Sequence, residues 1–294
     1  MRSAAEMVRA TTKLASLPSI YLRLTEVTNE PRSTAAEVAR VISEDTALAA
    51  RLLKLVNSSF YGFSHRIDTV TQAVSLVGTQ QVLDLALASS VTRAFAGIPP
   101  ERLDMDGFWR HSVACAIAAR HVAVRCRWPS PERVFVAGLL HDIGRLVLFL
   151  QEPQAMATAL ERAARDGRLL HVAEREICGF DHADVGRELL SAWKLPPVLQ
   201  EAVGRHHRPE RAGSHLKEAA AVHLGDLVAN AMALGSSGEQ LVPPLDGPAW
   251  AAISVEPAFL AELVAEVDRQ HADVVQVMLV YDYWSAGEAA AQAV

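Results

Sequence analysis

The sequence predicts an all-α protein, and three observations support that fold class. Alternating β-branched or aromatic runs that end at Asn-Gly or Asp-Gly turns are nearly absent. Alanine, leucine, valine, arginine and glutamate dominate the chain, and apolar residues recur at spacings of three and four. Signals for helix starts and helix ends follow one another at short intervals, as in a compact packing of helices.

Capping residues and glycines mark the helix boundaries. The predicted starts are Thr34 with Glu37, Ser130 with Pro131 and Glu132, Asp181 with Asp184, and Pro196 with Pro197. The predicted ends are Gly78, Gly97 and Gly167. Between them, apolar residues at helical spacing predict core-facing helices, as at Leu48, Leu52, Leu55 and Val56. A further apolar helix is predicted from Val134 to Leu150.

The composition excludes several classes of protein. The chain has 294 residues, of which 50% are hydrophobic, and a formal net charge of −6, so nucleic-acid binding has no general electrostatic basis. No apolar run approaches the ~18 residues of a transmembrane helix, and residues 1–10 lack the apolar stretch of a secretory signal. Three cysteines without a CxxC pattern indicate neither a disulfide framework nor a thiolate zinc site. We therefore expect no nucleic-acid partner and no membrane association.

Two irregular stretches indicate the domain organisation. The stretch Phe95–Asp106 predicts a boundary between an N-terminal helical subdomain, residues 1–100, and a second helical subdomain, residues 101–294. The first of these holds only one of the eleven histidines, His65. The stretch Gly235–Pro248, rich in glycine, serine and proline, predicts a surface loop before the last helices.

One polar and aromatic turn, Asn57–Gly62, interrupts the helices of the first subdomain. It is either a packed loop or a contact surface for a partner, with the Phe60-Tyr61-Gly62 run as the exposed part. The sequence leaves both interpretations open.

The most informative motif is the pair His141-Asp142, which lies inside the predicted apolar helix. Burying a histidine beside an aspartate is costly unless both side chains are satisfied. An imidazole nitrogen and a carboxylate oxygen that approach one centre from neighbouring directions suit a divalent metal ion. Taken alone, the dipeptide is explained better by a satisfied pair in the core.

Further histidines and an aspartate point inward from other predicted helices. His111 shares an apolar helix face with Phe108 and Cys115, and Asp226 lies on an apolar helix three residues after His223. The others are His182 in the first turn of a helix, and His206 and His207 at a helix end. Each one alone could be a capping, core or solvated residue. Together they predict metal coordination, which would satisfy all of these buried polar groups at once.

The order of these residues resembles a known superfamily. His111, His141-Asp142 and Asp226 follow the pattern of the HD phosphohydrolases, in which two histidines and two aspartates bind one metal ion and the HD aspartate can bridge to a second. His182, His206 and His207 resemble the second-metal ligands of the HD-GYP branch. The closest resemblance is to the HDOD domain, the HD-related output domain, over residues 14–230. The stretches that carry it are Leu17–Ile20, Ala50–Ser58, Phe60–Gly62, Ile67–Gly78, Phe108–Ser112, Leu139–Gly144, and Asp181–Gly186 through Trp193–Pro196.

The HDOD resemblance implies an N-terminal helical subdomain packed on an HD-like helical core, in a bacterial and cytoplasmic protein. Such domains are usually regarded as output or interaction domains of signalling systems, and many have lost metal ligands. In this chain all seven ligand positions are filled. Two positions depart from the HD-GYP pattern, since no Gly-Tyr-Pro follows His206-His207 and Arg145 stands where lysine is usual.

Two functions are compatible with this resemblance. The first is a signal-transduction domain that binds metal and acts through a signalling protein or a small phosphate-containing ligand. The alternative is a metal-dependent phosphohydrolase or phosphodiesterase acting on a nucleotide or a cyclic dinucleotide. In that enzyme Asp142 would be catalytic as the bridge between two ions, and Arg145 would contact the phosphate.

The ligand set also carries expectations about the metal. An imidazole-rich site favours iron or manganese over zinc or magnesium, as one ion or two. His223, one helical turn before Asp226, is expected to orient a ligand rather than to bind the metal. A homodimer is compatible with either function.

Overall fold

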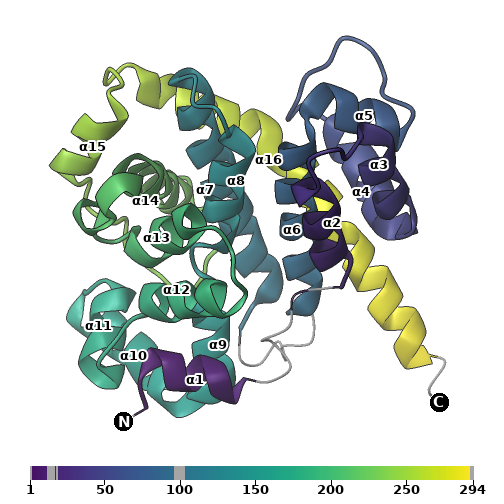
Figure 1. Ribbon diagram of the computed structural model, residues 1–294. Helices are drawn as coiled ribbons and strands as arrows, with labels where there is room; N and C mark the ends of the chain where they lie inside the picture. Colours follow the sequence, from purple (N-terminus) through teal and green to yellow (C-terminus); the bar gives the residue numbers. More distant parts are fainter. Residues whose placement is uncertain (1, 12–16, 18, 96–102, 292–294) are drawn as a thin grey trace. The chain divides into compact units, whose positions relative to one another are not determined.

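The structure is a computed structural model, and every regular element that it describes is a helix (Figure 1). The described residues are 2–11, 17, 19–95 and 103–291. Within them the fold is all-α, as the sequence predicts. Residues 96–102, which include Gly97 and most of the predicted boundary stretch, lie outside the described residues.

The chain forms two compact units. The larger unit comprises residues 1–16 and 97–268, and the smaller unit comprises residues 17–96 and 269–294. The subdomain limits expected from the sequence, 1–100 and 101–294, stay a prediction.

The smaller unit is built mostly from short helices, and two of the boundary signals predicted from the sequence lie in it. Its helices are α2 (Ser19–Asn29), α3 (Ala35–Ser43), α4 (Thr46–Val56), α5 (Val70–Val77), α6 (Thr79–Ala94) and the later part of α16 (Phe259–Ala291). Thr34 and Glu37 form the predicted capping box of α3, and Gly78 ends α5 at a φ of 99°. Leu48 and Leu55 of α4 are 2% exposed, so the apolar spacing marks the core face of that helix.

The larger unit carries the predicted metal ligands. Its helices are α1 (Ala4–Ala10), α7 (Met105–Arg125), α8 (Pro131–Leu140), α9 (Ile143–Gln151), α10 (Pro153–Asp166), α11 (Leu170–Cys178), α12 (His182–Ala192), α13 (Pro197–Arg205), α14 (Leu216–Ala231), α15 (Gly247–Ile253) and the start of α16. Helix α7 packs against α8 and α14, and α12 packs against α9 and α13. Alanines on the buried face of α7, such as Ala114 and Ala118, let its neighbours approach closely.

The prediction of one continuous helix from Val134 to Leu150 is wrong in one respect, because the helix is broken at His141-Asp142. Helix α8 ends at Leu140 and α9 begins at Ile143, with a turn between them. The Asp142 carbonyl accepts a hydrogen bond from the Arg145 N–H at 2.8 Å, which closes a three-residue turn in place of the regular helical bond. The Asp142 carboxylate caps no backbone N–H of α9, and it points to Arg145 and the histidines instead. The break places the motif at a junction of two helices.

The stretch Pro131–Gln151 is also long and apolar enough to cross a membrane, but 89% of its most apolar window is buried inside the protein. A buried stretch of this kind is typical of a core helix. A second candidate, Val70–Val77 with Thr79–Thr92, is bent by 116°.

The crossing of α9 and α12 depends on Gly144. A Cβ atom at this position would overlap the backbone carbonyl oxygen of His182 and would lie 2.5 Å from the backbone nitrogen of Gly186. We expect Gly144→Ala to lower the free energy of unfolding by about 2–3 kcal/mol, because backbone atoms cannot yield as a flexible side chain can. Urea denaturation measures the change. Gly247→Ala is the control, since a Cβ there meets open space, and an equal loss in both variants would contradict the packing argument.

Candidate metal centre

The structure brings all seven predicted ligands together in the larger unit. They come from α7 (His111), the α8–α9 junction (His141, Asp142), the start of α12 (His182), the end of α13 (His206, His207) and α14 (Asp226). The seven residues form three overlapping groups of three side chains. Within each group the ligand atoms all lie within 4.8 Å of one another. Six of the seven are buried and His207 is half-buried.

The first group is His111, His141 and Asp226. His111 Nε2 lies 3.3 Å from His141 Nε2 and 3.2 Å from Asp226 Oδ1. His141 Nε2 lies 3.6 Å from the same aspartate oxygen. The close packing of α7 with α8 and α14 thus aims two imidazole nitrogens and one carboxylate oxygen at a common point.

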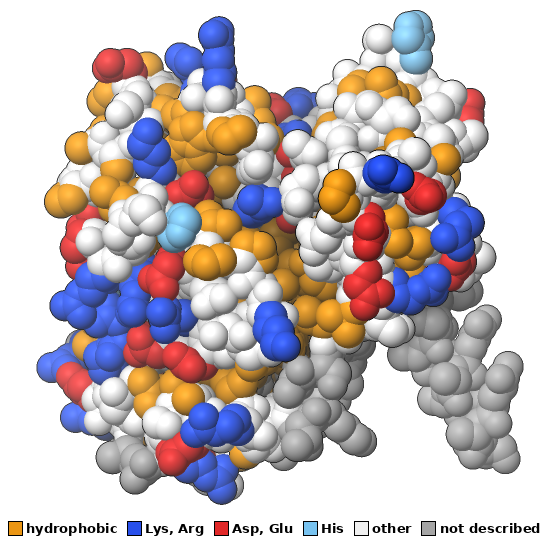
Figure 2. Space-filling model, viewed as in Figure 1, with side chains coloured by type: hydrophobic (Ala, Val, Ile, Leu, Met, Phe, Trp, Pro, Cys, Tyr) orange, Lys and Arg blue, Asp and Glu red, His pale blue; other side chains and the backbone are white. Residues whose placement is uncertain are grey.

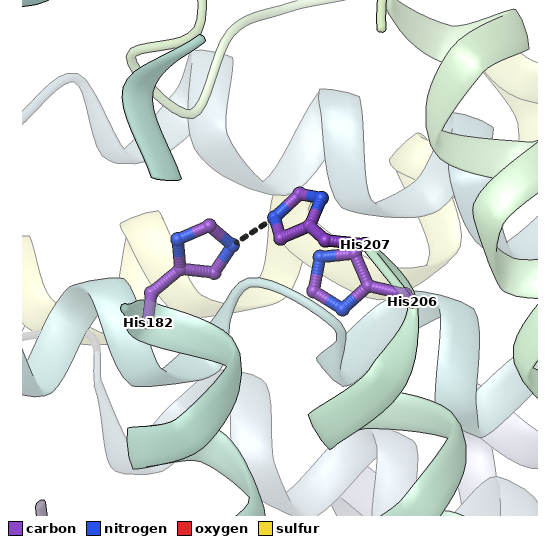
Figure 3. A group of neighbouring side chains, drawn as sticks. All are labelled: His182, His206 and His207. Carbon is purple, nitrogen blue, oxygen red and sulfur yellow. Dashed lines mark hydrogen bonds between the residues drawn. The ribbon is translucent and has the colours of Figure 1, made fainter. Parts of the chain in front are cut away.

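The second group is His182, His206 and His207 (Figure 3). His182 projects from α12, and the other two project from the end of α13 toward it (Figure 3). His207 Nε2 lies 3.0 Å from His182 Nε2, and the ring centroids of His206 and His207 are 3.9 Å apart. This group matches the residues that resemble the second-metal ligands.

Asp142 lies between the two groups. Its Oδ2 atom is 3.3 Å from His141 Nε2, and its Oδ1 atom is 2.8 Å from His182 Nε2. Burial alone would raise the pKa of Asp142, but the charges of Arg145, His141 and His182 hold it well below its ordinary value. Asp142 is therefore an ionised carboxylate with one oxygen toward each group.

Hydrogen bonds to backbone carbonyls fix the orientation of two histidine rings. Nδ1 of His141 donates to the Gly138 carbonyl and Nδ1 of His206 donates to the Val203 carbonyl, each at 2.7 Å. These bonds turn Nε2 of each ring toward the cluster, as in metal-ligating histidines. Burial lowers the pKa of His141, but Asp142 outweighs it and raises the pKa, so ligation through His141 Nε2 requires the loss of a proton.

His206 shows that the residues fit a metal ion. Its Nε2 atom is buried and has no hydrogen-bond partner among the described residues. Burial and the charges of His141 and His182 lower the pKa of His206 to about 3, so this ring is neutral. A buried acceptor without a partner is costly, and a bound cation would satisfy it. The donor set of imidazoles and carboxylates is one that divalent transition metals accept.

His223 has a different position from the ligands. Its Nδ1 atom donates to the His206 carbonyl at 2.9 Å, and its Nε2 atom accepts a hydrogen bond from the Asp246 N–H at 3.1 Å. Both ring nitrogens are engaged, so His223 holds the backbone of His206 and no nitrogen is left for a metal. Asp226 is instead oriented by Asn230, whose Nδ2 donates to Asp226 Oδ1 at 2.7 Å.

Three residues near the site were not predicted from the sequence: Glu174, His171 and Ser237. Glu174 is fully buried on α11, and its Oε2 accepts hydrogen bonds from His182 Nδ1 at 2.6 Å and from the His182 backbone N–H at 2.9 Å. Burial and Arg145 lower the pKa of His182, but Glu174 and Asp142 outweigh them and raise it to about 9. Ligation through His182 Nε2 therefore requires the loss of a proton.

A signal for Glu174 existed in the sequence. It lies four residues after Leu170 and three before Ile177, so it shares the apolar stripe that packs α11 against α10. A carboxylate in phase with such a stripe must find a buried partner. His171 had no comparable signal, yet its ring stacks on His207 with centroids 3.9 Å apart, and burial and the charge of His182 lower its pKa to about 4.

We expect Glu174→Gln to weaken metal binding by about 10-fold or more, because outer partners of ligating histidines raise their basicity and fix their rings. Isothermal titration with Mn²⁺ measures the affinity. Glu176→Gln is the control on the same helix, since Glu176 pairs with Arg168 at the surface. Equal affinities for both variants would show that Glu174 does not position His182.

Paired charges also anchor the start of α12 from the surface. Arginines and acidic residues are interspersed over α11, α12 and α13 (Figure 2). Asp181, the N-cap of α12, accepts hydrogen bonds from Arg175 at 2.6 Å and from Arg208 at 3.3 Å. Because Asp181 directly precedes His182 and Arg208 directly follows His207, these pairs tie together the two helices that carry the second group.

Arg145 is buried beside the second group, where its guanidinium contacts four residues. Nε donates to Glu174 Oε1 at 3.2 Å, and Nη1 donates to Asp142 Oδ2 at 2.9 Å and to the Ser237 carbonyl at 3.1 Å. Nη2 lies 3.2 Å from His182 Nε2. Burial lowers the pKa of Arg145, but Asp142 and Glu174 outweigh it and raise the pKa above its ordinary value. The arginine is thus a fixed positive charge held by the protein itself.

The chain matches one family model and several known proteins. The model of the HDOD domain matches residues 14–209. An uncharacterized protein of Treponema pallidum (strain Nichols) is 25% identical over 229 residues, which are 72% of this chain and 43% of that relative. The chain therefore spans less than half the length of this relative.

Solved structures show the same fold. An HDOD domain protein of unknown function from Geobacter sulfurreducens superimposes with a TM-score of 0.77 at 24% identity, over 94% of this chain and 98% of that one. A protein from Shewanella amazonensis SB2B, named as a candidate phosphohydrolase, superimposes with a TM-score of 0.72 at 28% identity, over 94% and 99% of the two chains.

Proposed function

This chain belongs to the HDOD domain family, and from that premise we propose that it is a bacterial regulatory domain that binds divalent metal. It acts through contacts with a signalling protein or with a small phosphate-containing ligand. Its metal ligands are His111, His141, Asp142, His182, His206, His207 and Asp226.

The observation that carries this proposal is the closure of the site. His111, His141, His182 and His206 have no exposed surface, and Asp142 and Arg145 are 2% exposed. Arg145, the residue that would contact a phosphate, already donates to Glu174, Asp142 and Ser237. A site that turns over substrate needs ready access to its ions, whereas a site that signals a conformation can stay closed until a ligand opens it.

The alternative function is a metal-dependent phosphohydrolase or phosphodiesterase acting on a nucleotide or cyclic dinucleotide. It is favoured by the complete ligand set and by Asp142, which has one oxygen toward each group. Divalent ions bound there would lower the pKa of a coordinated water and polarise a phosphate. Arg145 would stabilise the developing charge once it is freed from its present partners.

The proposal extends to the metal and the setting. We favour iron or manganese, as one ion or two, because of the number of imidazoles. The cytoplasm, where reduced cysteines are the rule, suits the three free cysteines of this chain. A homodimer is compatible with the proposed regulatory function. Direct nucleic-acid binding is not expected, because the chain has a net charge of −6.

Hydrolysis of bis(4-nitrophenyl) phosphate separates the two functions. The wild-type protein and Asp142→Ala are assayed with Mn²⁺ and, anaerobically, with Fe²⁺, and bound metal is measured in the same samples. We expect wild-type protein to bind metal and to hydrolyse no faster than Asp142→Ala. Metal-dependent hydrolysis that is lost in Asp142→Ala would contradict the regulatory proposal and support the enzyme.

A further inference from the structure

The segment between α14 and α15 covers residues 232–246. Its part from 235 to 246 begins directly against the candidate metal centre, and we call this part the 235–246 loop. It contains no helix and no strand. It begins against α7, where the Ser236 N–H donates to the Gly107 carbonyl at 3.0 Å. A Cβ atom on Gly235, which has a φ of 84°, would overlap that carbonyl and lie 2.7 Å from the backbone nitrogen of His111. The start of the loop is therefore seated one helical turn from the first group.

The next residue, Ser237, reaches the site itself. It is 1% exposed, although the residues on either side of it are exposed or half-buried. Its carbonyl oxygen accepts a hydrogen bond from Arg145 Nη1 at 3.1 Å, and its hydroxyl oxygen accepts from the same nitrogen. Ser237 thus offers two neutral oxygen acceptors to Arg145 Nη1, the nitrogen that also donates to Asp142 Oδ2.

The rest of the loop is held weakly. Glu239 Oε2 accepts a hydrogen bond from the Leu170 N–H at 2.7 Å, and Glu239 Oε1 accepts from Gln240 and Leu241 within the loop. Leu241 and Val242 are 39% and 52% exposed. At the far end of the loop the Asp246 N–H donates to His223 Nε2 at 3.1 Å. Between Ser237 and Asp246 the loop has few buried apolar side chains, and a segment of that kind opens at low cost.

We propose that the 235–246 loop is a lid latched by the Ser237–Arg145 contact, and that the phosphate group of a ligand releases it by replacing Ser237 on Arg145. This inference rests on the proposed binding of a phosphate-containing ligand at the metal centre. A phosphate oxygen accepts hydrogen bonds from a guanidinium more strongly than a carbonyl or a hydroxyl does, because the bond is charge-assisted. Ligand binding and loop release would then be the same event, in which a phosphate oxygen replaces the Ser237 oxygens as the acceptor for Arg145 Nη1.

The charges around Arg145 set the condition for this exchange. Asp142 and Glu174 contact the guanidinium and also contact His182, so the metal-free site already pairs its carboxylates with cations. A bound divalent cation would add positive charge beside them, and phosphate is therefore expected to compete with Ser237 more strongly in the metal-loaded protein. The lid would in this way report metal and phosphate together, as a regulatory domain requires.

Hydrogen–deuterium exchange of the loop amides tests the lid. Mn²⁺-loaded and metal-free proteins are compared with and without inorganic phosphate. In the loaded protein we expect phosphate to speed exchange by about 10-fold at two loop amides, Ser236 and Gly238, and at Leu170 of α11, whose N–H donates to Glu239 of the loop. Unchanged or slower exchange would overturn the lid, and so would an equal response in the metal-free protein.

Two serine variants separate the latch from general loosening of the loop. Ser237→Ala removes an acceptor from Arg145, so the phosphate concentration for half-maximal exchange should fall by about 5-fold. Ser236→Ala is the matched control, because its hydroxyl bonds to Gly238 and Glu239 within the loop and not to Arg145. Equal midpoints for the two variants would overturn the latch. Protein that binds no metal would overturn the proposed function and the lid with it, whereas bound metal without phosphate-dependent exchange would overturn the lid alone.

Discussion

Asp142→Asn is expected to lower the metal affinity of the protein by at least about 100-fold. The substitution keeps the shape of the side chain but removes the charge and one of the two oxygens that face the two groups of ligands. An amide nitrogen cannot ligate a cation, so the link between His141 and His182 is broken at its centre. Mn²⁺ titration followed by calorimetry measures the loss.

The matched control for this variant is Asp106→Asn. Asp106 lies on α7 in the same unit and forms an exposed pair with Arg110 at 2.5 Å. Its replacement should leave the affinity within about 2-fold, because exposed pairs contribute little. Similar affinities for Asp142→Asn and wild-type protein would show that the carboxylate is not a ligand.

Arg145→Met is expected to lower the free energy of unfolding of the metal-free protein by about 3–5 kcal/mol. The side chain is buried with Asp142 and Glu174, and its removal takes away a cation that both carboxylates contact, so that they are left to share His182. Methionine fills much of the space, so the loss in the free energy of unfolding comes mainly from the missing charge and hydrogen bonds and not from a cavity. Urea denaturation in the presence of EDTA measures the change.

Two further variants make the stability result specific. Arg165→Met replaces an arginine whose side chain is 70% exposed, and it should change the free energy of unfolding by less than about 0.5 kcal/mol. Arg145→Lys keeps the charge but cannot bond Glu174, Asp142 and Ser237 at once, so it should lie between wild-type protein and Arg145→Met. A loss below about 1 kcal/mol in Arg145→Met would contradict the buried network.

Local patterns predicted the helices because the same residues that favour a boundary also form it. Thr34 with Glu37 and Asp181 with Asp184 are capping boxes in the structure, and Gly167 ends α10 in the left-handed conformation. The seven candidate ligands could be found for two reasons. Polar side chains such as His111 lie on predicted apolar helices, where they need buried partners, and the order of the seven residues resembles that of a known family.

The parts that could not be predicted depend on long-range contacts. The break at His141-Asp142 is invisible to periodicity, because apolar residues continue in helical phase on both sides of it. Ser237 lies in a loop whose composition predicts only a surface, and its contact with Arg145 joins residues 92 positions apart. His171 reaches the site through the packing of α11 near the end of α13, which no local pattern specifies.

The central claim is that the seven residues bind metal, and metal content tests it most directly. Protein purified aerobically and anaerobically is dialysed, and its iron, manganese and zinc are counted per chain beside Asp142→Asn. We expect one or two ions per wild-type chain, with iron or manganese in excess, and little metal in the variant. Less than about 0.2 ions per wild-type chain in both preparations would contradict the claim.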